Sequence, residues 1–103
     1  MSSHLFSQDK DIDFRFTNSG WYEVLRLASE CGWRPIGTVL EDCPDWKGRY
    51  DSNDYQKVRA EDALALAAAV ETATQSPMLK PDWADYLRLF VDFARQSGGF
   101  RIG

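Results

Sequence analysis

Hydrophobic and polar positions alternate near the start of the chain and then follow helical periods. Ile12, Phe14 and Phe16 are separated by single polar residues, which predicts a half-buried strand over residues 12–17. Residues 1–11 are polar and show no period, so we expect a polar N-terminal segment that can be flexible. We expect residues 12–103 to form a single compact domain.

Residues 20–31 carry the pattern of an amphipathic helix. Its apolar face holds Trp21, Val24, Leu25, Ala28 and Cys31. Asn18 and Ser19 offer side-chain oxygens for the N-cap, and Gly32 suits the left-handed position that follows a helix. Because it falls on the apolar face, Cys31 is expected to be a structural thiol.

Two further helices are predicted in the second half of the chain. Residues 60–74 form an alanine-rich helix with a thin apolar stripe, so a neighbouring element can approach it closely. A third helix opens at Pro81, continues to about residue 97 and stops before Gly98 and Gly99. Its apolar surface is wider than one stripe, so this helix forms either the centre of the monomer core or a dimer face.

The fold class predicted by these elements is α+β, with three helices packed on a small, mostly antiparallel sheet. The strands are expected near residues 12–17, 36–40, 55–58 and 99–102. Pro35, Gly37, Pro44 and Gly48 interrupt residues 33–54, where an ordered loop is expected apart from the extended stretch 36–40.

Composition and charge narrow the class of protein. The 103 residues are 44% hydrophobic and 27% charged, which is enough apolar material for one core. Twelve basic residues against 16 acidic ones give a formal charge of −4, and no basic stripe is present, so we expect no nucleic-acid partner. With no signal peptide and no long apolar run, we expect no membrane association and a cytoplasmic location.

Few residues could support catalysis or metal binding. His4 is the single histidine, and Cys31 and Cys43 lack the spacing of a metal site. Neither glycine-rich phosphate-binding pattern occurs, and a calcium-binding loop starting at Asp51 fails because Tyr55 stands where an oxygen ligand is required. We therefore expect no catalytic residue, no metal ligand and no cofactor.

The most distinctive segment runs from residue 46 to residue 56, where large aromatic residues are mixed with turn formers. The candidate binding residues in it are Trp46, Gly48, Tyr50, Asn53, Asp54 and Gln56. Aromatic rings could form the wall of a binding cleft, and the amide and carboxylate groups could orient a ligand. In the alternative interpretation, the aromatic residues pack the loop onto the core and the polar residues close its turn.

Three stretches together resemble a family of small uncharacterised bacterial proteins. They are Gly32-Trp33-x-Pro35-x-Gly37-Thr38, then Trp46-x-Gly48-x-Tyr50-x-x-Asn53-Asp54-x-Gln56-x-Val58, then Asp62-Ala63-x-x-Leu66-Ala67. The resemblance covers about half the chain and implies a bacterial, cytoplasmic protein with one compact domain. It brings no activity, and Arg59 departs from it, since a small hydroxyl residue often precedes the second helix in such sequences.

Two classes of function fit these observations. The first is a non-enzymatic protein-interaction or regulatory module, such as an immunity or antitoxin protein, whose partner is a protein. The second is a small-ligand binder, or a cofactor-free enzyme, that uses the loop of residues 46–56. The sequence is compatible with a monomer and with a homodimer.

Overall fold

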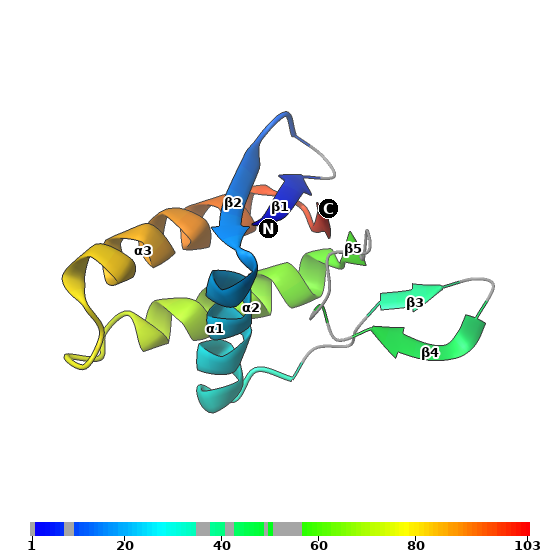
Figure 1. The fold of residues 1–103 in the computed structure, drawn as a ribbon. Helices are drawn as coiled ribbons and strands as arrows, with labels where there is room; N and C mark the ends of the chain where they lie inside the picture. The colour runs from blue at the N-terminus through cyan, green and yellow to red at the C-terminus, as the bar shows by residue number, and fades with distance from the viewer. Residues whose placement is uncertain (1, 8–9, 35–37, 41–42, 49, 51–56) are drawn as a thin grey trace.

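The computed structural model describes residues 2–7, 10–34, 38–40, 43–48, 50 and 57–103. Its elements, in chain order, are β1 (Ser2–Ser7), β2 (Asp13–Thr17), α1 (Asn18–Glu30), β3 (Thr38–Leu40), β4 (Cys43–Gly48), β5 (Lys57–Val58), α2 (Ala60–Ala73), α3 (Pro81–Gln96) and β6 (Phe100–Ile102). Within these residues, three helices accompany a four-stranded antiparallel sheet (Figure 1). The predicted α+β fold class is therefore confirmed.

The four-stranded sheet has the order β2-β1-β6-β5, which places the N-terminal strand inside it. The sequence predicts no strand in residues 1–11, and this expectation misses β1. Ser3 and Leu5 are buried, but serine favours turns over strands and the two apolar residues Leu5 and Phe6 are adjacent, so no alternation is visible. The strand forms because β2 and β6 bond its backbone from both sides.

The two faces of this sheet differ in polarity, as the period of a strand requires. One face is buried and carries Leu5, Phe16, Val58, Phe100 and Ile102. Residues that alternate with these on β2, β5 and β6, namely Asp13, Arg15, Lys57 and Arg101, are exposed. Where β6 begins, Gly99 adopts φ +99°, and a Cβ there would lie 2.8 Å from the carbonyl oxygen of Val58. Glycine thus lets β6 pass close to β5.

Strands β3 and β4 form a separate two-stranded antiparallel sheet. Thr38 pairs with Gly48 and Val39 with Lys47, and the register shifts before Leu40. The sequence predicts a strand of the main sheet at residues 36–40 and a loop at residues 43–48. Both expectations are wrong, because β3 and β4 pair with each other in a sheet of their own. A two-stranded ribbon consists of edge strands, which tolerate residues such as Pro44 that do not suit a central strand. Figure 1 shows this hairpin projecting away from the main sheet.

Helix α1 begins and ends close to its predicted positions. Its N-cap is Thr17, whose hydroxyl accepts a hydrogen bond from the Gly20 N–H, rather than Asn18 or Ser19. Gly32 follows the helix with φ +91°, which confirms its predicted left-handed role. Cys31 is exposed at the C-cap, so its expected place on the buried face is wrong, and Leu27 is buried instead.

Helix α2 is the more buried of the two long helices, although α3 has the wider apolar surface in sequence. Seven of the 14 residues of α2 are buried, against six of the 16 residues of α3. The small alanine side chains of α2 allow α1 and α3 to pack against it. Helix α3 buries Leu87 and Phe90 completely and leaves part of its apolar surface outside the core.

Within the described part of the chain, none of the helices is both long enough and apolar enough to cross a lipid bilayer.

Candidate functional site

The structure describes three of the six binding residues predicted from the sequence. Trp46 and Gly48 belong to β4, where the backbone of Gly48 pairs with Thr38. Tyr50 lies beyond the end of that strand. Asn53, Asp54 and Gln56 lie outside the described residues. A ligand site in this loop therefore stays a prediction, and of its residues Tyr50 has surroundings that the structure describes.

Tyr50 is held in the interior by contacts with two helices and with Trp33, which follows α1. Its side chain has no exposed surface, and its hydroxyl donates a hydrogen bond to the buried carboxylate of Asp62 on α2, at 2.5 Å. Its carbonyl oxygen accepts a hydrogen bond from the indole N–H of Trp21 on α1, at 2.6 Å. Its ring stacks on Trp33 with 6.2 Å between ring centroids. These contacts make Tyr50 an anchor that ties the chain after β4 to the helices.

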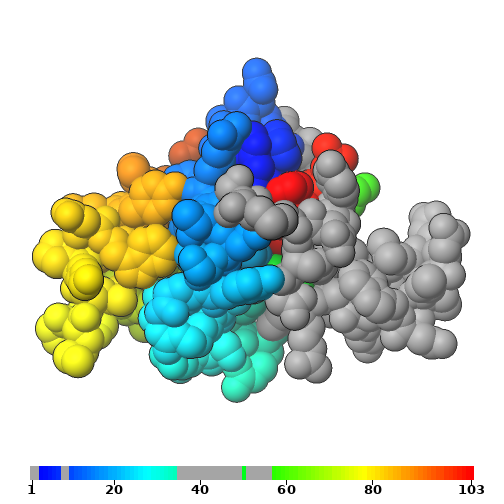
Figure 2. Space-filling model, in the orientation of Figure 1, coloured from blue at the N-terminus to red at the C-terminus, as the bar shows by residue number. Residues whose placement is uncertain are grey.

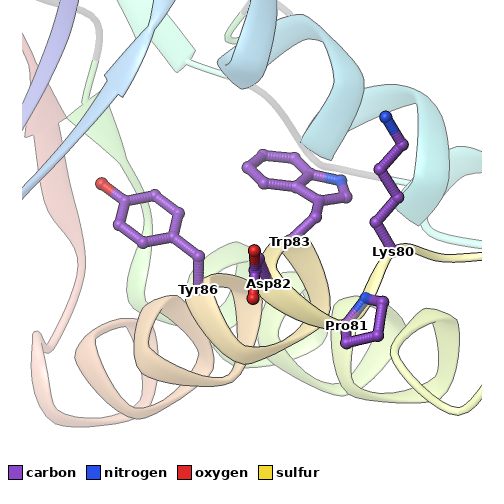
Figure 3. Close-up of a pocket in the computed structure, with 5 residues that line it drawn as sticks. All are labelled: Lys80, Pro81, Asp82, Trp83 and Tyr86. Carbon is purple, nitrogen blue, oxygen red and sulfur yellow. The ribbon is translucent and has the colours of Figure 1, made fainter.

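An open groove lies elsewhere, between α3, β2 and the start of α1. It consists of two adjoining hollows that share Trp83 and Tyr86. The first, of about 680 Å³, is lined by Lys80, Pro81, Asp82, Trp83 and Tyr86 (Figure 3). The second, of about 390 Å³, is lined by Arg15, Phe16, Thr17, Gly20, Trp83 and Tyr86. We call the two hollows together the Trp83–Tyr86 groove.

The groove results from the spacing of aromatic residues on α3. Trp83 and Tyr86 are one helical turn apart, so they project from the same side of the helix, as Figure 3 shows. Their rings stack with 6.1 Å between centroids and an interplanar angle of 20°. Phe16 of β2 lies behind them and meets both rings edge-on, at 6.0 Å and 5.5 Å. Buried Phe90 supports Phe16 in turn, at 5.3 Å.

Tyr86 also fixes the position of β2 relative to α3. Its hydroxyl donates a hydrogen bond to the carbonyl oxygen of Arg15, and its side chain remains 38% exposed. Partial burial raises the pKa of the Tyr86 hydroxyl above its ordinary value. Since β2 is the outermost strand and pairs with β1 alone in its sheet, this bond satisfies a carbonyl on the open edge of the sheet. The Tyr86 ring is thereby fixed in place while one side of it faces solvent.

Two basic residues and one acidic residue line the groove. Arg15 borders the hollow beside β2, and Lys80 borders the hollow at the start of α3. Figure 3 shows the Lys80 side chain rising beside Trp83. Ion pairs among the described residues involve Arg26, Arg88 and Arg95 but neither Arg15 nor Lys80. Asp82 lines the same hollow as Lys80, so the groove is aromatic and carries charges of both signs.

The groove is lined by aromatic and charged residues. Its described residues include no histidine, no cysteine and no pair of carboxylates, which are the groups that most often act as acids, bases or nucleophiles. The Thr17 hydroxyl is occupied as the N-cap of α1. In the described parts of the chain, no group of three histidine, cysteine or acidic side chains could hold a metal ion. A rigid aromatic wall with charged ends is typical of a recognition surface.

Sequence reasoning did not identify the groove as a site, although one signal for it was visible. The apolar surface of residues 81–97 is too wide for one buried stripe, which indicates either a core helix or an interface. On this helix Leu87 and Phe90 are buried, whereas Trp83 and Tyr86 are partly exposed. Figure 2 shows the yellow and orange atoms of α3 adjoining the blue atoms of β2 and the start of α1 on this face.

Comparison of the chain with protein-family models, with curated proteins and with solved structures found no match.

Proposed function

We propose that this protein is a non-enzymatic interaction module that binds a segment of another protein in the Trp83–Tyr86 groove. The observation that carries the proposal is the pair of stacked, partly exposed rings of Trp83 and Tyr86, held in place by buried neighbours. Fixed aromatic side chains give large contact area at little cost in conformational entropy. An immunity or antitoxin protein would be one instance of such a module.

The residue types in the groove support this proposal. Tryptophan, tyrosine and arginine are the residues most enriched at the energetic centres of protein interfaces, and Trp83, Tyr86 and Arg15 supply one of each. The groove is also open, so a side chain from a partner can enter it without rearrangement of the fold.

A photocrosslinking experiment tests the proposal in cells. Tyr86 is replaced by p-benzoylphenylalanine, and the matched control carries the same replacement at Tyr22, which is 52% exposed on α1 and outside the groove. We expect irradiation to give one dominant adduct with a protein at position 86 and not at position 22. The adduct should vanish when Trp83→Ala is added. Equal adduct patterns at the two positions would refute the proposed function.

A further inference from the structure

We infer that two copies of this chain associate through the open edge of the four-stranded sheet, with β2 of one copy antiparallel to β2 of the other. The interaction surface is the strand Asp13–Thr17. Among the described strands, β2 pairs with β1 alone, and Figure 1 shows it beside β1 at one margin of the sheet. The inference goes beyond the proposed function and does not rest on it.

The backbone of β2 leaves alternate residues available to a further strand. Ile12 bonds to β1, because its carbonyl oxygen accepts a hydrogen bond from the Ser7 N–H. Bonded and non-bonded pairs alternate in an antiparallel ladder, so Asp13 and Arg15 direct their N–H and C=O groups away from β1. The bond from the Tyr86 hydroxyl to the Arg15 carbonyl oxygen agrees with this direction. That oxygen has a second lone pair, so it can also accept a bond from a neighbouring strand.

The charges of β2 select one register for a symmetric pair of strands. Asp13 and Arg15 are exposed and lie on the face of the sheet opposite to buried Phe16. A two-fold axis at Phe14 sets Asp13 of each copy opposite Arg15 of the other, and opposite charges across strands attract. An axis at Asp13 or at Arg15 would set two like charges opposite each other, and an axis at Phe16 would extend the pairing into α1. The strand is therefore complementary in charge to itself in the register centred on Phe14.

The same register agrees with the backbone directions and with the aromatic side chains. Each opposed pair of Asp13 and Arg15 can exchange both of its N–H···O bonds, because both residues direct these groups outward. Phe14 then faces Phe14 of the second copy at a position without such bonds, where opposed side chains approach most closely. Its ring is partly buried, and its centroid lies 5.0 Å from that of Tyr86. Two such rings can pack on each other at the axis.

The existing contact of Asp13 is compatible with this arrangement. Its carboxylate lies 2.5 Å from Nε2 of His4 on β1, and a carboxylate has further acceptor sites for a guanidinium group. Charged residues on an edge strand often keep separate chains apart. A strand with one sign of charge would do so here, but the alternating signs of Asp13 and Arg15 let two antiparallel copies attract.

A charge swap tests the inference by sedimentation velocity of the full chain between about 1 μM and 1 mM. We expect the wild-type protein to form a dimer whose fraction rises with concentration. Asp13→Arg or Arg15→Asp alone should raise the dissociation constant about ten-fold, because either change sets like charges opposite each other in both pairs. The double variant Asp13→Arg/Arg15→Asp restores opposite charges and should dimerise like the wild-type protein. A mixture of the two single variants should form heterodimers for the same reason.

Asp92→Arg is the matched control, because Asp92 is exposed on α3 and the substitution changes the charge as Asp13→Arg does. It should leave the dissociation constant unchanged. The three substituted positions are exposed, so circular dichroism should show the same fold for every variant. A wild-type protein that stays monomeric at about 1 mM would overturn the inference. Failure of the double variant to recover association, or equal dimerisation of all variants, would also overturn it.

Amide hydrogen exchange followed by NMR locates the interface. The N–H groups of Asp13 and Arg15 should exchange slowly where the wild-type protein is dimeric and quickly in the two single variants. The N–H of Phe14, which faces β1, is the internal reference and should be protected in all of them. A wild-type dimer with fast exchange at both amides would use another surface and would contradict the inference. None of these variants alters Trp83 or Tyr86, so failure of the dimer leaves the proposed function standing.

Discussion

The surroundings of Tyr50 and the Trp83–Tyr86 groove are both rich in aromatic residues, but Tyr50 is buried whereas Trp83 and Tyr86 are partly exposed. Around Tyr50 the ring is buried, the hydroxyl and the carbonyl oxygen are both hydrogen-bonded, and the Tyr50 side chain has no exposed surface. In the groove, Trp83 and Tyr86 are fixed by neighbours on one side and open on the other. Aromatic composition alone therefore does not locate a binding site, whereas aromatic rings that are held in place and still accessible do.

Charge separates the two regions further. Asp62, beside Tyr50, is buried and bonded to it, whereas Arg15, Lys80 and Asp82, which line the groove, are exposed. A buried polar group must find its partner within the fold, because leaving it unsatisfied costs about 1–3 kcal/mol. An exposed cation has no such requirement, because water solvates it, and it remains accessible to a partner. The comparison predicts that substitutions around Tyr50 will lower stability, whereas equivalent substitutions in the groove will weaken binding.

The largest effect is expected at Phe90, which both regions share. Its buried ring lies 5.3 Å from Phe16 of the groove and 6.0 Å from Trp21, the donor to the Tyr50 carbonyl oxygen. Phe90→Ala should lower the free energy of unfolding by about 3–5 kcal/mol, because it leaves a cavity in the core. Urea denaturation followed by circular dichroism measures this loss. A loss below about 1 kcal/mol would show that the two regions do not depend on a common core.

Removal of the Tyr50 hydroxyl should have the next largest effect. The hydroxyl donates to the buried carboxylate of Asp62, and hydrogen bonds to charged groups contribute about 1.5–3 kcal/mol. Tyr50→Phe should therefore lower the free energy of unfolding by about that amount and leave the photocrosslinking yield at position 86 unchanged. Urea denaturation and the photocrosslinking experiment measure the two effects. A lower yield at unchanged stability would mean that Tyr50 belongs to a binding site after all.

The same chemical deletion at Tyr86 should cost less stability. Its hydroxyl bonds to the Arg15 carbonyl oxygen on an open strand edge, where water can replace it. Tyr86→Phe should lower the free energy of unfolding by less than about 1 kcal/mol and keep the ring stacked on Trp83. If both tyrosine variants lose equal stability in the same denaturation assay, the contrast between anchor and groove is wrong.

The smallest effect is a pH dependence specific to Tyr86. Its pKa is raised by burial, so in the range above the ordinary tyrosine pKa the folded state holds a proton that the unfolded state releases. The stability linked to this group is complete below pH 10 and is lost as pH rises through the raised pKa. The midpoint temperature of thermal unfolding should fall between about pH 9 and 11, and this fall should be shallower in Tyr86→Phe than in the wild-type protein. Identical slopes for the two proteins would count against partial burial of this hydroxyl.

The helices were predictable because their signals are local. The period of apolar residues, Pro81 at the start of α3 and Gly32 after α1 all act within a few residues of the chain. β1 was not predictable, because its apolar residues Leu5 and Phe6 are adjacent rather than alternating and its backbone partners come from β2 and from the distant β6. The separate pairing of β3 with β4 was missed because Pro44 and Gly48 indicate a loop.

The groove could not be predicted from the sequence for a related reason. Arg15, Gly20 and Trp83 lie on three elements, and only the packing of α3 beside β2 and α1 brings them together. The exposure of a side chain could not be predicted from the sequence either, because Leu87 and Trp83 are both hydrophobic but only Leu87 is fully buried. For Tyr50, one of the two interpretations offered by the sequence, that of packing onto the core, describes its observed surroundings.

The central place of β1 has a consequence for how the polypeptide acquires its structure. β1 bonds to β6, and His4 and Gly103 exchange both of their backbone hydrogen bonds, so the sheet joins the first strand of the chain to the last. During synthesis β1 can pair with β2 early, but its other edge stays open until Phe100–Ile102 has left the ribosome. Such distant pairing slows folding and leaves an unpaired strand exposed to other chains in the meantime. A nascent chain stalled before β6 should therefore be a better substrate for chaperones than the finished protein.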